Sequence, residues 1–309
     1  MTSTNEQELV FTGLSGSSLL GFLAALGTLH TLDSISETEG TKMQWNSHGT
    51  LYYPSICLPA SLDREWLLSS LDKSLKYYAG HATVTFASDL KITPKQFRHL
   101  AETQCKEYLS ENDRLGAAVT AAFGCESVTN DEGNIEDTAF RTMSGAGHQH
   151  FLAFMNELAK NTHAEHLREA IFGPWRFRDP SPTMRWDEAD DRRYALRWDE
   201  PSKDPVRTVR GANRLAIAGL PFFTVAPTSS TSVATTGFAG QRSNNTFFSW
   251  PLWSGWLGVD VVRSLLAMPE LQKADVPLGK LHHIRVHAVC RSQRVTLGKY
   301  RNFTPAKFL

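Results

Sequence analysis

The sequence predicts an α+β fold, with a helical N-terminal and middle part and a mostly β, basic C-terminal part. Apolar residues recur with helical spacing in several segments up to residue 172. After residue 220, short apolar segments alternate with Ser/Thr/Asn turns, which is typical of strands. The chain has 309 residues and 41% hydrophobic content, enough for one large core or two modest ones. No run of 18 apolar residues occurs, so we expect no membrane span.

The first predicted helix begins at Ser17 or Ser18, either of which can serve as its N-cap, and ends near Leu32. A short strand, Glu8–Thr12, precedes it. Apolar residues cover most of the helix surface, so it should be buried. Gly21 and Gly27 each cost about 1 kcal/mol relative to alanine, which indicates close packing against a neighbour.

The glycine-rich turn before this helix offers an alternative. Gly13, Gly16 and Ser17 precede a helix N-terminus, as in a phosphate-binding loop. The chain contains neither GK[ST] nor GxGxxG, so core packing is the favoured interpretation.

The middle of the chain is predicted to be mainly helical. Val84 and Phe86 alternate as in a strand, and Pro94 suits the first turn of a helix. The predicted elements are strand and turn Trp45–Tyr53, helix Leu62–Tyr78, strand Ala82–Ala87, helix Pro94 to about Leu109, helix Leu115–Phe123, loop Cys125–Asp137, and helices His148–Lys160 and His163–Phe172.

After Gly173-Pro174 the composition changes. Trp175–Pro205 is rich in Arg, Asp, Trp and Pro and is predicted to be a long ordered loop. The elements predicted beyond it are helix Arg214–Leu220, strands Phe222–Ala226, Val233–Phe238 and Thr246–Trp250, helix Asp260–Met268, and a hairpin of His282–Cys290 and Gln293–Gly298 turning at Arg291-Ser292. Residues 1–174 and 175–309 form two regions by composition, either separate or parts of one continuous domain.

The formal net charge of zero hides an asymmetry. Pro205–Leu309 contains 13 lysines and arginines but 3 acidic residues, a net charge of +10, and the rest of the chain therefore carries −10. Pro205–Val259 and Val276–Leu309 contain no carboxylate side chain. This distribution favours an anionic partner, above all nucleic acid. The alternative is that the basic third packs against the acidic part and cancels its charge.

Eight basic residues of this region are predicted to contact nucleic-acid phosphates. Arg207, Arg210 and Arg214 are spaced to share a helix face, and Gly211 and Asn213 between them could admit a phosphate to the backbone. The others are Arg242, Arg291, Arg294, Lys299 and Arg301. Tyr300 and Phe303 interleave with them, as suits single-stranded nucleic acid. The alternative is an ordinary solvated edge hairpin.

An acidic cluster could instead bind two metal ions and cleave nucleic acid. Its members are Asp187, Glu188, Asp190 and Asp191, and each has an arginine within a few residues, which favours local ion pairs. The histidine clusters lack HExxH, and no serine occurs in GxSxG. We therefore expect no catalytic residue, metal or cofactor, and no enzymatic activity.

The four cysteines, Cys57, Cys105, Cys125 and Cys290, are scattered and form no CxxC pair. That spacing is typical of reduced thiols rather than of zinc ligands or disulfides. The first nine residues are polar and lack a basic segment, which is unlike a signal peptide. We expect a cytoplasmic protein.

Several stretches resemble large-subunit and accessory proteins of type I-G (formerly I-U) CRISPR-Cas systems. They are GLSGSSLLGFLAALGTLHTLD (Gly13–Asp33), RWDEADDRRYALRWDEPS (Arg185–Ser202), RGANRLAIAGLPFF (Arg210–Phe223) and FFSWPLW…LGVDVVRSLLAMPEL (Phe247–Leu271). The chain is shorter than a typical large subunit. The resemblance implies an RNA-guided effector complex, with crRNA, target DNA and other subunits, among them the nuclease-helicase, as partners.

The sequence thus supports the hypothesis of a non-catalytic nucleic-acid-binding subunit of a prokaryotic antiviral effector complex. One alternative is an assembly subunit that docks proteins without touching nucleic acid. The other is a metal-dependent nuclease that uses the acidic cluster.

Overall fold

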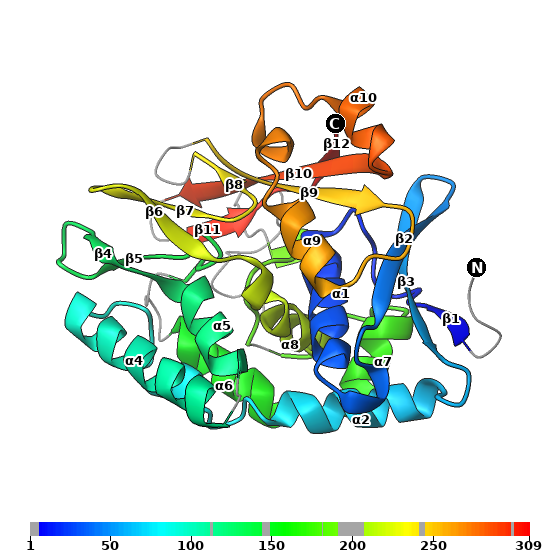
Figure 1. Ribbon diagram of the computed structural model, residues 1–309, viewed down its shortest axis with the longest axis horizontal. Helices are drawn as coiled ribbons and strands as arrows, with labels where there is room; N and C mark the ends of the chain where they lie inside the picture. The colour runs from blue at the N-terminus through cyan, green and yellow to red at the C-terminus, as the bar shows by residue number, and fades with distance from the viewer. Residues whose placement is uncertain are drawn as a thin grey trace.

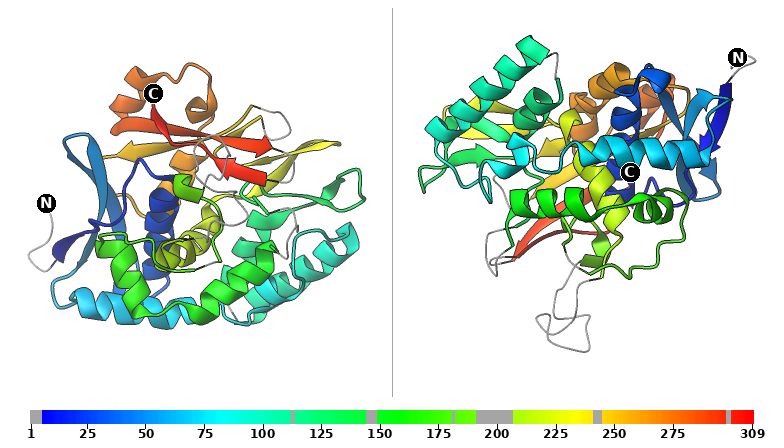
Figure 2. Two further views of the ribbon diagram at one scale, coloured as in Figure 1. Left: turned by 180° about the vertical axis from the view of Figure 1, so that it is seen from behind. Right: turned by 90° about the horizontal axis from the view of Figure 1, so that it is seen from below.

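The computed structural model describes residues 6–111, 114–143, 149–180, 182–190, 207–240, 245–297 and 300–309. It confirms a mixed α+β fold with helices mainly in the N-terminal and middle parts and an antiparallel C-terminal sheet. Figure 1 shows this sheet along one side of the molecule and a layer of helices along the opposite side, with α1 (Leu19–Asp33) and α8 (Arg210–Ala218) between them. Figure 2 shows the same layers from behind and from below.

The other helices come mostly from the middle of the chain. They are α2 (Arg64–Lys76), α3 (Ala82–Thr85), α4 (Pro94–Glu111), α5 (Arg114–Phe123), α6 (Phe151–Asn161), α7 (Ala164–Phe172), α9 (Val259–Leu266) and α10 (Leu278–His283). Among the described residues, no helix combines the length and the apolar composition that crossing a membrane requires.

In the part of the chain that the structure describes, the strands form two larger antiparallel sheets and two hairpins. The N-terminal sheet has the order β1 (Glu6–Val10), β3 (Leu51–Pro59), β2 (Lys42–His48). The C-terminal sheet has the order β11 (Tyr300–Phe303), β10 (Val286–Leu297), β9 (Thr246–Trp253), β8 (Phe238–Ala239), and β12 (Lys307–Phe308) also pairs with β10. The hairpins are β4 (Gly124–Thr129) with β5 (Ile135–Asp137), and β6 (Val225–Ser229) with β7 (Ser232–Thr235).

Helix α1 is the buried centre of the fold, as its apolar surface predicts. Ser18 is its N-cap and accepts a hydrogen bond from the Gly21 amide at 3.2 Å. A Cβ atom on Gly21 would lie 2.5 Å from the Ser15 carbonyl oxygen, and one on Gly27 would overlap the Leu215 carbonyl of α8. Both glycines therefore mark close backbone packing, which confirms the prediction.

The glycines before α1 also serve packing. A Cβ atom on Gly16 would lie 2.9 Å from the Leu252 side chain and 3.0 Å from the Trp45 ring. A Cβ atom on Gly13 would overlap the Ala170 carbonyl of α7. Side chains and backbone of other segments therefore fill the space next to these two glycines, where a phosphate-binding loop would hold its phosphate.

One hydrophobic core joins both ends of the chain, from Phe11 to Phe303. The Phe140 ring lies within it, with ring centres 4.9 Å from Phe223, 4.8 Å from Phe238 and 5.2 Å from Phe248. Such tilted and edge-on aromatic contacts stabilise a core beyond simple burial. The regions 1–174 and 175–309 therefore contribute to a shared core.

Two predicted elements in the middle of the chain were wrong. Residues 82–85 form a short helix rather than a strand, because the His81 side chain caps it by accepting a hydrogen bond from the Thr83 amide at 3.2 Å. Residues 124–137 form a hairpin rather than a loop. Its turn is held by Asn130, whose side-chain oxygen accepts hydrogen bonds from the Glu132 and Asn134 amides.

The predicted terminal hairpin has a different register. Arg291 and Ser292 do not form a turn but lie within β10, opposite Ser249 and Phe248 of β9. The hairpin is instead made by β10 and β11, with Leu297 opposite Tyr300. The strand continues through Arg291-Ser292 because its partner is β9, which sequence periodicity does not identify.

Candidate nucleic-acid contacts and a charged cavity

Arg207 and Arg210 lie beside Arg176 and Arg178, two arginines that were not among the predicted contacts. An isolated β-bridge between Asp179 and Thr208 joins the two segments. Arg176, Arg178 and Arg207 are exposed, and Arg210 is half-buried. We call these four arginines, Arg176, Arg178, Arg207 and Arg210, the basic strip.

The guanidinium groups of the basic strip contact backbone rather than acids. Arg207 Nη1 donates to the Arg178 carbonyl at 3.1 Å, and Arg210 Nη1 donates to the Asn161 carbonyl at 3.3 Å. Within the described parts of the chain, none of the four guanidinium groups has a carboxylate oxygen within 4.0 Å. Toward the described residues the strip therefore uses few of its N–H donors, although Arg210 Nε is buried.

The start of α8 does not form the expected phosphate cradle. Asp179 Oδ2 accepts a hydrogen bond from the Arg210 amide at 2.9 Å and so occupies the helix N-terminus itself. A Cβ atom on Gly211 would overlap the His166 carbonyl, and Asn213 is fully buried, where its side-chain oxygen accepts from the Met184 amide at 2.8 Å. These residues pack α8 and give no access to a phosphate.

Arg214 lies in the core, contrary to its predicted place on an exposed helix face. Its side chain is 0% exposed, Nη2 donates to the Leu75 carbonyl at 2.6 Å, and its guanidinium carbon lies 4.6 Å from the centre of the Tyr78 ring. Burial lowers the pKa of Arg214 to about 10, so it stays charged at neutral pH. A guanidinium enclosed in this way does not reach a phosphate on the surface.

Arg291 holds the segment that follows α9. Its Nε donates to Ser249 Oγ at 2.7 Å, and its Nη2 donates to the carbonyls of Leu271 at 3.1 Å and Lys273 at 2.7 Å. These bonds tie β10 to the turn at residues 271–273, so they give Arg291 a structural role.

Arg294 and Arg301 belong to a partly buried group of charges, which we call the ionic cluster and define as Asp89, Asp137, Arg141, Arg294 and Arg301. Arg141 is its centre, with Nη2 at 2.6 Å from Asp137 Oδ2 and Nη1 at 3.5 Å from Asp89 Oδ1. Arg294 Nη2 donates to the Arg141 carbonyl at 2.8 Å, and burial lowers the pKa of Arg294 to about 10.

Arg301 is the member of the ionic cluster with the fewest contacts. It is half-buried, and its guanidinium makes no hydrogen bond to another described residue. Burial, and then the neighbouring charge of Arg141, lower the pKa of Arg301. The three arginines outnumber the two carboxylates of the cluster, and Glu136 adds a further negative charge that acts on Arg301.

The remaining predicted residues, Arg242 and Lys299, lie outside the described residues. The same holds for Asp191 of the acidic cluster. Asp187 and Asp190 are buried, and Asp190 Oδ2 accepts a hydrogen bond from Thr183 Oγ1 at 2.6 Å. Burial raises the pKa of the Asp187 carboxyl. Within the described ranges, no three His, Cys, Asp or Glu side chains gather as metal ligands would.

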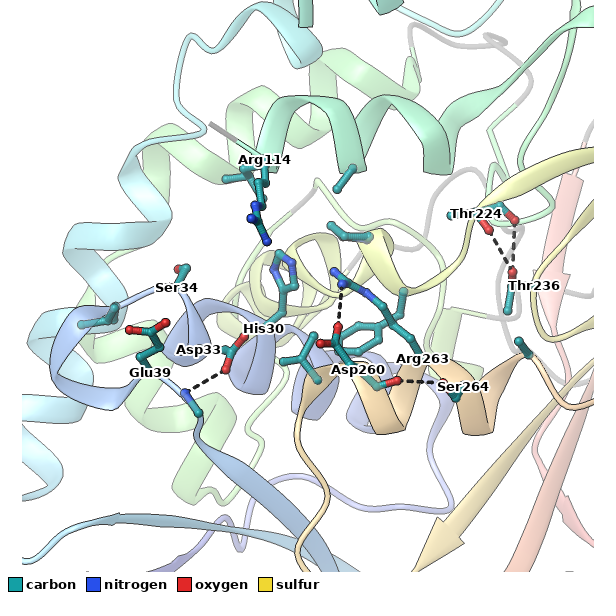
Figure 3. Close-up of a pocket in the computed structure, with 18 of the residues that line it drawn as sticks. His30, Asp33, Ser34, Glu39, Arg114, Thr224, Thr236, Asp260, Arg263 and Ser264 are labelled. Carbon is teal, nitrogen blue, oxygen red and sulfur yellow. Dashed lines mark hydrogen bonds and ion pairs between the residues drawn. The ribbon is translucent and has the colours of Figure 1, made fainter. Parts of the chain in front are cut away.

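A cavity of about 1230 Å³ opens between α1, the start of α5, and α9. Figure 3 shows the Arg114 guanidinium of α5 pointing toward the His30 ring, while Arg263 of α9 lies close to the same ring. Asp33 and Glu39 lie on the other side of His30 in this view. We call this space, lined by these five residues among others, the charged cavity.

His30 is the titratable group at the centre of the charged cavity. Burial, and then the charge of Arg263, lower the pKa of His30 to about 4, so the ring is neutral at physiological pH. Its ring centre lies 5.8 Å from that of Phe222, edge-on at 70°. Neither ring nitrogen is hydrogen-bonded to a described residue.

Sequence reasoning missed the charged cavity, the two extra arginines of the basic strip, and Arg141. Arg176 and Arg178 alternate with Trp175 and Phe177, and that period of two was the available signal for arginines on one side of an extended chain. The cavity gave no signal, because its charges come from segments more than 200 residues apart. Comparison with known protein families and with curated proteins found no significant match to the chain.

Proposed function

We propose that the chain is a non-catalytic, nucleic-acid-binding subunit of a cytoplasmic type I CRISPR-Cas effector complex, and that the basic strip contacts phosphates. The observation that carries the proposal is the absence, among described residues, of any carboxylate within 4.0 Å of its four guanidinium groups. Arg176, Arg178 and Arg207 are exposed, and an exposed guanidinium group suits bidentate contacts to phosphate oxygens. Trp175 and Phe177 alternate with Arg176 and Arg178 and pack partly buried against the core, so the two arginines face away from it.

The charge asymmetry supports the same proposal. Between the described residues before and after position 205, no ion pair lies within 4.0 Å. The basic third forms ion pairs only with its own acids there, Arg263 with Asp260 and Lys273 with Glu270. In the described structure the positive charge of the basic third is therefore not cancelled by ion pairs within 4.0 Å, and only Arg294 and Arg301 lie in the electrostatic field of Asp137.

Binding of a fluorescent single-stranded oligonucleotide, measured by anisotropy at several salt concentrations, tests the proposal. We expect the double variant Arg207→Ala, Arg210→Ala to weaken binding about equally for oligonucleotides of different sequence. The slope of log affinity against log salt should flatten by roughly 1.4, which corresponds to two lost phosphate contacts on a single strand.

The matched control removes two basic residues that already have partners. Arg168 pairs with Glu65 at 2.5 Å and Lys76 with Asp72 at 2.7 Å, so Arg168→Ala with Lys76→Ala should leave the slope nearly unchanged. A folded Arg207/Arg210 variant that retains both affinity and slope would refute the phosphate contacts. Co-purification with the products of neighbouring genes then tests the assembly role independently.

A further inference from the structure

We infer that the charged cavity binds a nucleotide, with its phosphate between Arg114 and Arg263 and its base toward Asp33 and Glu39. This site is separate from the basic strip and goes beyond the proposed function, which does not require it. The proposal depends on three features of the cavity: two arginines with few contacts at one end, carboxylates at the other, and a neutral histidine between the two ends.

The cationic end has unused donors. Arg114 is exposed, and no carboxylate lies within 4.0 Å of its guanidinium among the described residues. Arg263 contacts Asp260 by one atom pair, Nη1 to Oδ1 at 3.3 Å, and that carboxylate is 93% exposed. An exposed pair of this kind is weak, so the Asp260 contact leaves Arg263 able to bind a phosphate oxygen. Two guanidinium groups from separate helices can hold one phosphate from two sides.

His30 gives the cavity a neutral polar group beside these cations. Its ring points into the cavity in Figure 3 and has no hydrogen bond to a described residue. A neutral imidazole offers one donor and one acceptor. It can therefore bind a phosphate oxygen or a sugar hydroxyl without competing with the arginines for charge.

The opposite end carries negative charge. Glu39 is exposed, and Asp33 Oδ1 accepts a hydrogen bond from the Gly40 amide at 3.1 Å, which leaves its second oxygen for a ligand. The helix dipoles have the same polarity as these side chains. The negative C-terminus of α1 lies at Asp33, whereas the positive N-termini of α5 and α9 lie at Arg114 and Val259. With Asp260 included, the cavity has two cations and three carboxylates, which excludes a simple anion as the best ligand.

A nucleotide fits this polarity because it has an anionic phosphate at one end and, in many bases, an exocyclic amine at the other. Carboxylates accept hydrogen bonds from such amines. The volume of about 1230 Å³ is above the roughly 300–1000 Å³ typical of small-molecule sites, so a whole nucleotide has room. Ile35, Leu115 and Phe222 supply apolar surface for the base and sugar.

Calorimetric titration with four probes tests the assignment: adenosine monophosphate, adenosine, inosine monophosphate and inorganic phosphate. We expect adenosine monophosphate to bind tightest, since adenosine lacks the phosphate and inosine lacks the amine. Arg114→Gln and Arg263→Gln should each weaken its binding about tenfold or more. Asp33→Asn with Glu39→Gln should bring the adenosine and inosine monophosphates to similar affinities.

The control is Arg64→Gln, which removes an arginine stacked at 4.7 Å over the Phe172 ring, outside the cavity lining, and should not change binding. Equal binding of adenosine monophosphate and phosphate, or arginine variants that bind like the wild type, would overturn the proposal. A 5′-phosphorylated oligonucleotide that binds more tightly than its 5′-hydroxyl form through Arg114 and Arg263 would assign the site to a strand end rather than to a free nucleotide. The double variant Arg207→Ala, Arg210→Ala leaves the charged cavity intact. Failure of the proposed phosphate contacts is therefore distinguishable from failure of nucleotide binding in the cavity.

Discussion

Gly27 of α1 lies directly against the backbone carbonyl of Leu215 in α8. The contact joins a residue of the N-terminal region to one of the basic third, and it sits between the sheet and the helical layer (Figure 1). A side chain at position 27 would meet backbone, which cannot swing aside as a flexible side chain can. The two helices can therefore approach this closely only with glycine at that point.

Gly27→Leu should lower the free energy of unfolding by about 1–3 kcal/mol or more, because the added atoms force α1 and α8 apart. Urea denaturation followed by circular dichroism measures the change. Gly279→Ala is the control, since a Cβ atom there meets nothing within 4 Å. Equal unfolding midpoints for Gly27→Leu and wild type would show that α1 and α8 do not pack as described.

Arg214 should prove to be a stability residue rather than a nucleic-acid contact. Arg214→Ala should cost about 2–5 kcal/mol, since it opens a cavity in the core. Arg214→Met keeps most of the volume and removes a buried charge whose Nε and Nη1 have no hydrogen-bond partner in the described structure, so its stability should stay within about 1 kcal/mol of wild type. Neither change should alter the salt slope of oligonucleotide binding; a flatter slope in folded Arg214→Met would contradict the burial.

The difference between Arg207 and Arg214 shows what the sequence could and could not predict. The spacing of the arginines and the lack of local acids were visible, but whether a guanidinium faces solvent depends on which helix packs over it. Leu75 and Tyr78 cover Arg214 from more than 130 residues away. Similarly, the buried helix α1 was predictable from its composition. The pairing of β10 was not, because β10 lies between β9 and β11 and its alternating pattern does not identify its two neighbours.

His30 should make stability depend on pH. Its pKa is about 4 in the folded protein against 6.5 when unfolded, so the folded state binds fewer protons between these values. Stability is therefore full above pH 6.5 and is lost as the pH falls through that range, by up to about 3 kcal/mol. Thermal unfolding of wild type and His30→Gln at pH 4–7.5 isolates this contribution as their difference. A difference that does not vary with pH would contradict the low pKa.

Arg291 and Arg301 were both predicted to contact phosphates, but we expect Arg291 to affect stability and Arg301 to affect oligonucleotide binding. Arg291 bonds to the Leu271 and Lys273 carbonyls, so Arg291→Ala should destabilise the protein by about 2–3 kcal/mol and leave the salt slope unchanged.

Arg301 is the opposite case, because its guanidinium has no hydrogen bond to another described residue and it lies beside Arg141 and Arg294. Arg301→Gln removes the repulsion from Arg141 together with the attraction of Asp137 and Asp89, so stability should change little, yet it should weaken oligonucleotide binding and flatten the slope by roughly 0.7. Urea denaturation and salt-dependent anisotropy on the same two proteins give both quantities. If Arg301→Gln unfolds more easily and Arg291→Ala binds more weakly, their roles are reversed and the ionic cluster is structural only.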